Sequence, residues 1–429
     1  MATFVEVISQ EMIKPSSPTP QHLQKLNLSY LAQLSESLYS SIIFFYQADD
    51  EVVNNHHVQK SQRLKQSLSH TLTSFYPLAG RIQDNFTIYC NDAGVEFINA
   101  RAVDHAQLDS AIQEQPNNID QDHLKQYVPE DPNSTAAETV RPLFLVQITY
   151  LDRGGIVVGI RFSHRIADCA SIMDFMNAWA SANVTDDDTV IPTPARLISF
   201  DLANYFPGRD IPSMRLFNFC GEKFRTRRFV FDKVKLEALR HLAESNVKEP
   251  TRVELVSSFI WKSFMQSSAN VDGDTSKMFV TGHSVNLRAR KKSLENVFGN
   301  CVMPAVAYES SSGGGEFHEV VSKLRSAIRR VDEDYITKSM GQGGLLDDLN
   351  QFGGMLMTGQ VEMFGFTSWC RFPVYEADFG WGKPIWLGPA EMPNDGAVLV
   401  NSRCGDKIEA WVNMNQDALS ILEAKFKLI

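Results

Sequence analysis

Residues 183–225 divide the 429-residue chain into two halves of similar length. This segment shows little helical or strand periodicity and is punctuated by prolines, which is typical of a connection between domains. The prolines are Pro192, Pro194, Pro207 and Pro212. Since domains hold roughly 150 residues each, the length alone allows two or three of them. The position of this segment favours two domains, which cover residues 1–182 and 226–429 and are connected by the crossover 183–225.

The first half mixes helices with strands. Apolar residues at helical spacing, Leu64, Leu68, Leu72 and Phe75, predict an amphipathic helix over 58–75. Strands are predicted at 86–90 and 95–99, and alternating apolar residues predict a β-hairpin of 143–151 and 155–163. A helix is predicted to follow at about 168–181.

The second half repeats this mixture without a visible internal repeat. Strands are predicted at 227–232, 278–286, 301–308, 364–370, 397–403 and 407–413. Helices are predicted at 233–245, 251–268, 316–337 and 416–427. Because strands and helices alternate throughout, the fold class is α/β or α+β with two layered domains.

The charge balance excludes one class of partner. Basic residues number 41 and acidic residues 51, so the formal net charge is −10, which argues against nucleic-acid binding. The dense basic runs are 225–228 and 288–292, and the second could hold a small anion. The first residues show no secretory signal, and the apolar run 42–46 is too short to span a bilayer, so we expect a cytosolic protein. Its six cysteines lack the spacing of a zinc site or a disulfide scaffold.

His164 and Asp168 lie where the second strand of the hairpin gives way to a helix. A largely neutral imidazole can take a proton from an alcohol that attacks a carbonyl. Asp168 could orient that imidazole, or it could hold the loop through an arginine. A structural histidine at a strand end is the alternative to a catalytic one. A metal site lacks a third ligand at sensible spacing.

Residues 375–384 form a second distinctive segment, in which Gly380 and Gly382 flank Trp381. Two glycines so close together indicate unusual backbone angles or close approach of another segment. On composition alone, Asp378 is a turn acid and Phe379 and Trp381 are packing residues. Sequence separation cannot say whether this loop meets His164.

Together, the H-x-x-x-D of residues 164–168 and the D-F-G-W-G of 378–382 resemble the paired signature of the plant BAHD acyl-CoA-dependent acyltransferases. Further blocks resemble the branch of vinorine synthase and salutaridinol acetyltransferase, so the similarity runs nearly end to end. These blocks are 14–20, 75–81, 90–94, 228–232, 250–254, 285–288 and 367–371.

The resemblance implies two similar-sized α/β domains of the chloramphenicol acetyltransferase-like type, with the active site in a channel between them. It makes His164 the general base, pairs Asp168 with Arg288, and gives the indole N–H of Trp369 to the oxyanion. Asp378 is the acid of the second motif and is expected to hold its loop, with Gly380, Trp381 and Gly382 as structural support.

The resemblance also implies acyl-CoA as co-substrate, most simply acetyl-CoA, with no permanently bound cofactor and no metal. The residues that match CoA-binding positions are Thr251, Arg252, Ser284, Val285, Arg288, Arg290, Ser368 and Arg371. The expected acceptor is the hydroxyl of a plant specialised metabolite, an alkaloid first, then a sugar, a terpenoid or a phenolic. The expected protein is a monomer that binds neither nucleic acid nor membrane.

One position departs from the family. Relatives carry Leu-Ser-x-Leu-Asp-Gln near the N-terminus, where this chain has Ala32 in place of the acid. The change could reshape acceptor binding, or mark an altered or non-catalytic relative. An amine acceptor is a further alternative. The segment 341–360, with Met355 and Met357, is interpreted as a mobile surface loop or as an adaptable edge over an apolar acceptor.

Overall fold

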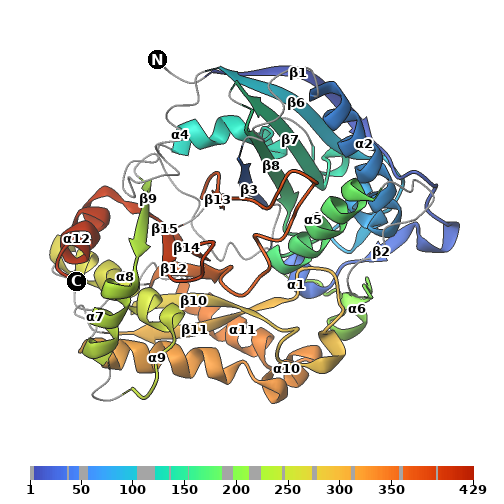
Figure 1. Cartoon of the computed structure of the whole chain (residues 1–429). Coiled ribbons are helices and arrows are strands. Elements are labelled where there is room, and N and C mark those ends of the chain that lie inside the picture. Colours follow the sequence, from blue (N-terminus) through green and yellow to red (C-terminus); the bar gives the residue numbers. More distant parts are fainter. Residues whose placement is uncertain are drawn as a thin grey trace.

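The computed structural model contains two six-stranded mixed sheets, each covered by helices (Figure 1). It describes residues 4–35, 38–47, 57–103, 121–134, 137–152, 154–185, 197–211, 224–243, 247–272, 278–310, 315–356, 361–392 and 395–429. The α/β class with two layered halves is therefore confirmed.

The first sheet is built mainly from the N-terminal half. Its strand order is β1 (Phe4–Ile13), β6 (Val95–Val103), β7 (Phe144–Leu151), β8 (Ile156–Ser163), β3 (Tyr39–Tyr46) and β13 (Trp386–Pro389). Every residue of β7 and β8 is buried, which explains why both strands are almost continuously apolar. These two strands are the predicted hairpin. Helices α2 (His57–Ser74) and α5 (Cys169–Val184) pack together over one face of this sheet (Figure 1).

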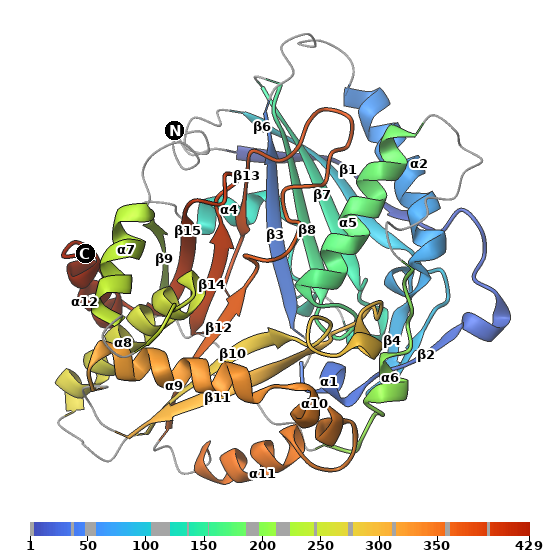
Figure 2. The same ribbon diagram turned by 60° about the horizontal axis from the view of Figure 1, so that its bottom comes forward.

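The second sheet comes from the C-terminal half. Its order is β11 (Val302–Glu309), β10 (Met278–Asn286), β12 (Val361–Ser368), β14 (Gly396–Asn401), β15 (Ile408–Asn415) and β9 (Phe224–Phe231). Helices α7 (Lys233–Ala243), α8 (Arg252–Asp272), α9 (Phe317–Arg330) and α12 (Gln416–Phe426) cover its outer face (Figure 2). Alternate residues of β11, namely Met303, Ala305 and Ala307, are buried in the core shared with these helices. The intervening residues of β11 therefore face the other half of the molecule.

Shorter elements complete the two halves. A small sheet contains β2 (Lys25–Asn27), β5 (Thr87–Tyr89) and β4 (Arg81–Asp84). The short helices are α1 (Tyr30–Gln33), α4 (Gln121–Leu124) and α6 (Leu202–Tyr205), and α10 (Glu333–Met340) and α11 (Leu345–Leu356) follow α9. No helix among the described residues is long and apolar enough to cross a membrane.

Several features of the fold differ from what the sequence indicates. Strands β1 and β3 were not predicted, and α11 occupies much of the segment that was interpreted as a loop. The single helix expected over 316–337 is two, because Asp332 accepts a hydrogen bond from the backbone N–H of Tyr335 and so begins α10. In addition, β13 lies late in the chain but pairs with β3, from Trp386 with Phe45 to Pro389 with Ile42. The two halves are therefore interlocked through a shared sheet. The exact limits of the two domains stay a prediction, since much of the crossover lies outside the described residues.

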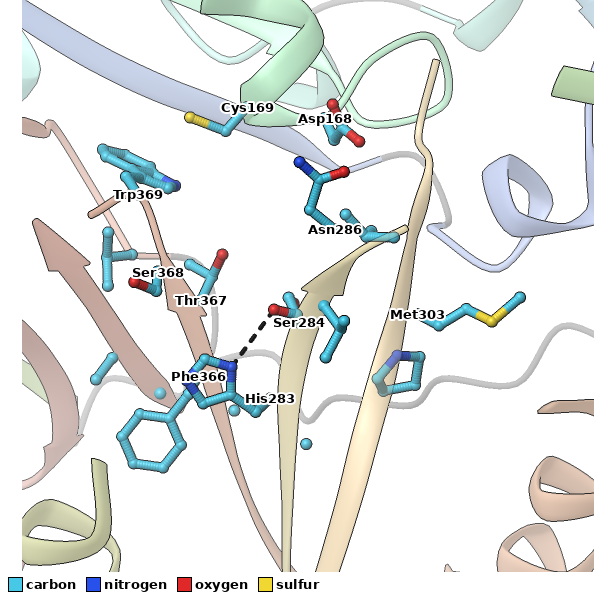
Figure 3. Close-up of a pocket in the computed structure, with 18 of the residues that line it drawn as sticks. Asp168, Cys169, His283, Ser284, Asn286, Met303, Phe366, Thr367, Ser368 and Trp369 are labelled. Atoms are coloured by element: carbon cyan, nitrogen blue, oxygen red, sulfur yellow. Dashed lines mark hydrogen bonds between the residues drawn. The ribbon is translucent and has the colours of Figure 1, made fainter. Parts of the chain in front are cut away.

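The parallel pairing of β10 with β12 ends partway along the strands. It runs from Met278 opposite Val361 to His283 opposite Phe366. Beyond that point β10 continues to pair with β11, and β12 continues to pair with β14. The second sheet consequently opens between Ser284 on one side and Thr367 on the other (Figure 3).

Candidate active site

A cavity of about 1050 Å³ lies between the two halves of the chain. Its wall on the first sheet includes Ser40 and Ser41 of β3 and Phe162 of β8. Its wall on the second sheet includes the ends of β10 and β12 that face the opening in that sheet (Figure 3). A ligand in this cavity would touch both halves at once. The volume of the cavity is that of a small-molecule site.

His164 lines this cavity directly after the end of β8. Its backbone N–H donates to the carbonyl oxygen of Leu38 at 2.8 Å, which fixes the turn that follows the strand. Burial lowers the pKa of the imidazole from its usual 6.5, and the nearby Asp168 opposes this only in part. The imidazole is therefore neutral at neutral pH and able to accept a proton.

Asp168 begins α5 and is turned into a network of donors. One carboxylate oxygen accepts from the Ser171 N–H at 2.9 Å, and the other accepts from the Cys301 N–H at 2.9 Å and Arg288 Nη1 at 2.8 Å. Both Asp168 and Arg288 are buried. The ion pair that the resemblance implied is thus present, and it joins α5 to the segment that follows β10.

Arg288 is held on every side. It donates to the carbonyl oxygens of Val297 and Gly299 and to the hydroxyl of Ser171, besides Asp168. Burial opposes its charge, yet the carboxylate of Asp168 leaves the pKa of Arg288 raised. Because Arg288 does not line the cavity, it supports the site from behind and is not placed to touch CoA.

Trp369 follows β12 and lines the cavity, and Figure 3 shows its side chain below that of Cys169. Its backbone N–H donates to the carbonyl oxygen of Leu399 at 2.8 Å, which fixes the residue beside β14. Within the described residues, its indole N–H makes no hydrogen bond. This donor is therefore available to a ligand, as an oxyanion donor must be.

Asp378 acts within its own loop. Its Oδ1 accepts from the backbone N–H groups of Gly380 at 2.8 Å and Gly382 at 3.0 Å. Both glycines have φ near +97°, a conformation that favours residues without a Cβ. Asp378 is not among the residues that line the cavity. The structure thus brings His164 and Trp369 to one cavity and leaves Asp378 outside it.

The rings of the same loop anchor it to the first sheet and its helices. Phe379 and Trp381 stack with ring centroids 5.5 Å apart, and both pack edge-on against Tyr46. The carbonyl oxygen of Phe379 accepts from the side-chain amide of Asn183 at 2.7 Å. Since this loop leads into β13, its packing sets where the second half of the chain joins the first sheet.

Seven of the eight sequence-predicted CoA residues line the cavity, and Arg288 is the exception. These seven are Thr251, Arg252, Ser284, Val285, Arg290, Ser368 and Arg371. They come from the start of α8, the end of β10 and the end of β12, on both sides of the opening in the sheet. A narrow ligand arm could pass through this opening, with basic side chains at its outer end.

Sequence reasoning missed three polar residues of the cavity wall. Ser41, His283 and Asn300 line the cavity, and each has a buried side-chain atom that lacks a hydrogen-bond partner. His283 stacks on Phe366, and burial lowers its pKa to about 4. No motif marks these positions. The available signal was a polar residue inside an otherwise apolar strand, as at Ser41.

Ala32, the departure from the family pattern, lies in α1 and is buried in the first core. Its N–H donates to the hydroxyl of Ser29, which begins this helix. Its neighbours Leu31 and Leu34 line the cavity, whereas Ala32 does not. In segment 341–360, Leu345 and Leu349 line the cavity, while the side chains of Met355 and Met357 lie outside the described residues. Across the described residues, no three acidic, histidine or cysteine side chains are grouped as for a metal ion.

Comparison with known proteins gives matches along the whole chain. The model of the Transferase family matches residues 3–429. Stemmadenine O-acetyltransferase of Catharanthus roseus is 36% identical over 99% of this chain and 98% of its own. Vinorine synthase of Rauvolfia serpentina is 36% identical over 98% and 97%, and a limonoid 1-O-acetyltransferase of Citrus sinensis is 34% identical over 97% and 95%.

Solved structures share the architecture. The crystal structure of vinorine synthase superposes with a TM-score of 0.80 at 33% identity, over 99% of this chain and 98% of that one. TRI101 of F. sporotrichioides, solved with coenzyme A and T-2, superposes with a TM-score of 0.67 over 94% and 98%. At 14% identity, that second likeness concerns the fold alone.

Proposed function

Because the chain belongs to the Transferase family, the BAHD acyl-CoA-dependent acyltransferases, we propose that it transfers an acetyl group from acetyl-CoA to a hydroxyl of a plant specialised metabolite. The observation that carries this proposal is the placement of His164 and the indole of Trp369 in one cavity between the two halves. A base and an oxyanion donor are the two groups that acyl transfer to an alcohol requires.

The proposed reaction proceeds in a ternary complex. His164 takes the hydroxyl proton as the acceptor oxygen attacks the thioester carbonyl, which forms the new C–O bond. The carbonyl oxygen becomes an oxyanion, which accepts a hydrogen bond from the Trp369 indole N–H. Collapse of this intermediate breaks the C–S bond, and His164 returns its proton to the leaving thiolate. The balance closes with an ester and free CoA.

Asp168 and Asp378 are proposed as positioning residues. Asp168 is engaged by Arg288 and two backbone N–H groups, so its charge holds the turn that carries His164. Asp378 holds the loop of Gly380 and Gly382. In this proposal neither carboxylate exchanges a proton with the substrates.

Acyl-CoA is proposed to enter through the opening between β10 and β12. Its phosphates would meet Arg290 and Arg371, and its thin pantetheine arm would run between Ser284 and Ser368 toward Trp369. Guanidinium groups suit phosphate oxygens because they offer several donors and a fixed charge. The arm matches the narrow gap between two strands better than any bulky group does.

The acceptor class is proposed from the relatives. Two relatives at 36% identity carry names of alkaloid-forming enzymes, which favours an alkaloid alcohol, and the limonoid acetyltransferases at 34% make a terpenoid alcohol the second candidate. Sugars, phenolics and amines are further alternatives within the family. We propose a monomer that acts in the cytosol.

The test is turnover. Purified protein is incubated with acetyl-, malonyl-, benzoyl- and branched acyl-CoA against a panel of plant alcohols, and free thiol and product mass are followed. His164→Ala is the control. Turnover well above this control supports an acyltransferase. If no pair of donor and acceptor exceeds the control, the acyltransferase proposal fails.

A further inference from the structure

Four carboxylate side chains line the cavity, and each of them already has a partner. They are Asp168, Glu254, Glu391 and Asp395. Asp168 pairs with Arg288, Glu254 with Arg325, and Glu391 with Arg161. Asp395 likewise has an interaction within the protein. The three named arginines are not themselves part of the cavity wall.

Arginines outside the cavity wall neutralise Asp168, Glu254 and Glu391. The guanidinium of Arg325 donates three hydrogen bonds to Glu254, and this keeps the pKa of that carboxyl lowered although burial opposes it. Arg161 is buried and also donates to the carbonyl oxygen of Pro129, so it is fixed beside Glu391. The negative charges of Asp168, Glu254 and Glu391 are therefore compensated before any ligand enters.

The basic residues of the wall behave differently. Arg252, Arg290, Arg329 and Arg371 line the cavity, and none of them forms an ion pair with a described carboxylate. Arg252 donates to the carbonyl oxygen of Gly405, and Arg290 donates to the carbonyl oxygens of Ile328 and Val331. The uncompensated charge of the cavity is consequently positive.

The rest of the wall offers no countercharge. The opposite walls are apolar, with Leu31, Leu34, Leu38, Val302, Val306 and Leu345 among the lining residues. Of the lining histidines, burial lowers the pKa of both His164 and His283, so neither carries charge at neutral pH. Bound acyl-CoA would engage the arginines through its phosphates. A cationic acceptor would need a carboxylate, and the carboxylates of the wall already have partners.

From this charge distribution we infer that the acceptor binds as an uncharged molecule. A polycyclic alcohol without an amine binds as it is, and an alcohol that contains an amine binds in its unprotonated form. A protonated ammonium would lose its hydration in an apolar cavity without gaining an ion pair. This inference rests on the proposed function and narrows its acceptor to neutral, apolar alcohols.

The experiment compares three acceptors that share one skeleton. The first is a carbocyclic alcohol, the second carries a tertiary amine in place of one carbon, and the third is the N-methyl quaternary salt of the second. We expect kcat/KM for the quaternary salt to be at least about 100-fold below that of the neutral alcohol. For the amine, kcat/KM relative to the neutral alcohol should fall about tenfold for each pH unit below the pKa of the amine, because only the free base binds.

Glu391→Gln makes the wall more positive, because it leaves the charge of Arg161 without its carboxylate partner. It should therefore lower kcat/KM for the quaternary acceptor further relative to the neutral one. Val306→Asp is the converse variant, because it places a carboxylate without a partner in the apolar wall. This variant should raise kcat/KM for the quaternary acceptor relative to kcat/KM for the neutral one. A quaternary acceptor that the wild-type protein uses as well as the neutral one overturns the inference.

Binding provides a readout that does not need turnover. If none of the three acceptors is acylated, the proposed function fails for this skeleton, and calorimetric titration of the neutral and quaternary compounds into protein saturated with CoA still decides the question of charge. Preference for the neutral compound supports the inference. Equal or tighter binding of the quaternary salt contradicts it.

Discussion

Arg288 Nη1 donates to Asp168 across 2.8 Å, and this buried ion pair connects helix α5 of one half with the end of β10 in the other. The same carboxylate accepts the N–H of Cys301, which precedes β11. Asp168 therefore fixes two strands of the second sheet relative to the turn that carries His164. Asp168 thus joins three segments of the chain around the candidate site.

Asp168→Ala should reduce stability and activity together. It leaves the Arg288 charge buried without its partner, which costs about 3–5 kcal/mol. The variant should unfold at lower denaturant concentration, and its residual activity should keep the wild-type pH dependence. Glu423→Ala is the matched control, because Glu423 pairs with Arg227 in a half-exposed position and its loss should cost under about 1 kcal/mol. An Asp168→Ala protein of normal stability with a shifted pH profile would contradict this assignment.

His164→Ala should lower kcat by about 10²–10⁴-fold, the usual contribution of a general base. In the wild type, burial lowers the pKa of His164 from 6.5, so the neutral, active form persists to a lower pH than for an exposed histidine. The acid limb of kcat/KM should therefore lie below pH 6.5, with little change above it. The same shift means that His164 stabilises the fold at neutral pH relative to acid, and that this contribution is lost as pH falls through its lowered pKa. A pH–rate profile and a denaturation series at several pH values measure both.

Asp378→Asn should lose much activity without loss of the base. The carboxylate accepts two backbone N–H groups, and weakening them loosens a loop whose rings pack on Tyr46. We expect a fall in stability of about 0.5–1.5 kcal/mol, since two exposed backbone donors lose a charged acceptor. The acid limb of the pH–rate profile should remain. Disappearance of that limb, with His164 intact, would give Asp378 a direct part in proton transfer.

Local patterns predicted those parts of the fold that depend on local packing. The buried hairpin β7 and β8 and the helix after it were predicted from the sequence pattern, and the structure adds that Asp168 caps this helix. The pairing of β13 with β3 could not be predicted, because it joins Trp386 to Phe45 across most of the chain. The break between α9 and α10 depends on one cap at Asp332, which periodicity does not register.

The candidate site divides in the same way. The change from strand to helix made His164 a candidate base, with a structural histidine as the alternative. The choice of His164 as the base, the role of Trp369 and the ion pair of Asp168 with Arg288 came only through family resemblance. The opening between β10 and β12 and the orphaned side chains of Ser41 and His283 depend on strand register between distant segments. A single sequence contains no direct signal for such register.

Arg371→Ala should raise KM for acyl-CoA at least about tenfold and leave stability unchanged. Arg371 is exposed in the cavity wall, and the hydrogen bond of a guanidinium to a phosphate is worth about 1.5–3 kcal/mol. The matched control is Arg403→Ala, since Arg403 is also exposed but does not line the cavity. Steady-state kinetics at a saturating acceptor concentration measures the difference. Equal effects of the two variants would mean that Arg371 contributes only general positive charge.

Trp369→Phe tests the oxyanion donor, because it removes the indole N–H and keeps an aromatic ring in the cavity. If this N–H binds the oxyanion, kcat should fall about 10²–10³-fold while KM for both substrates changes little, since the bond forms only in the transition state. Trp411→Phe is the control. Trp411 is also buried, its indole nitrogen has no hydrogen-bond partner, and it does not line the cavity, so this variant should keep kcat. A rise in KM with unchanged kcat in Trp369→Phe would instead make Trp369 a surface against which the acyl-CoA arm packs.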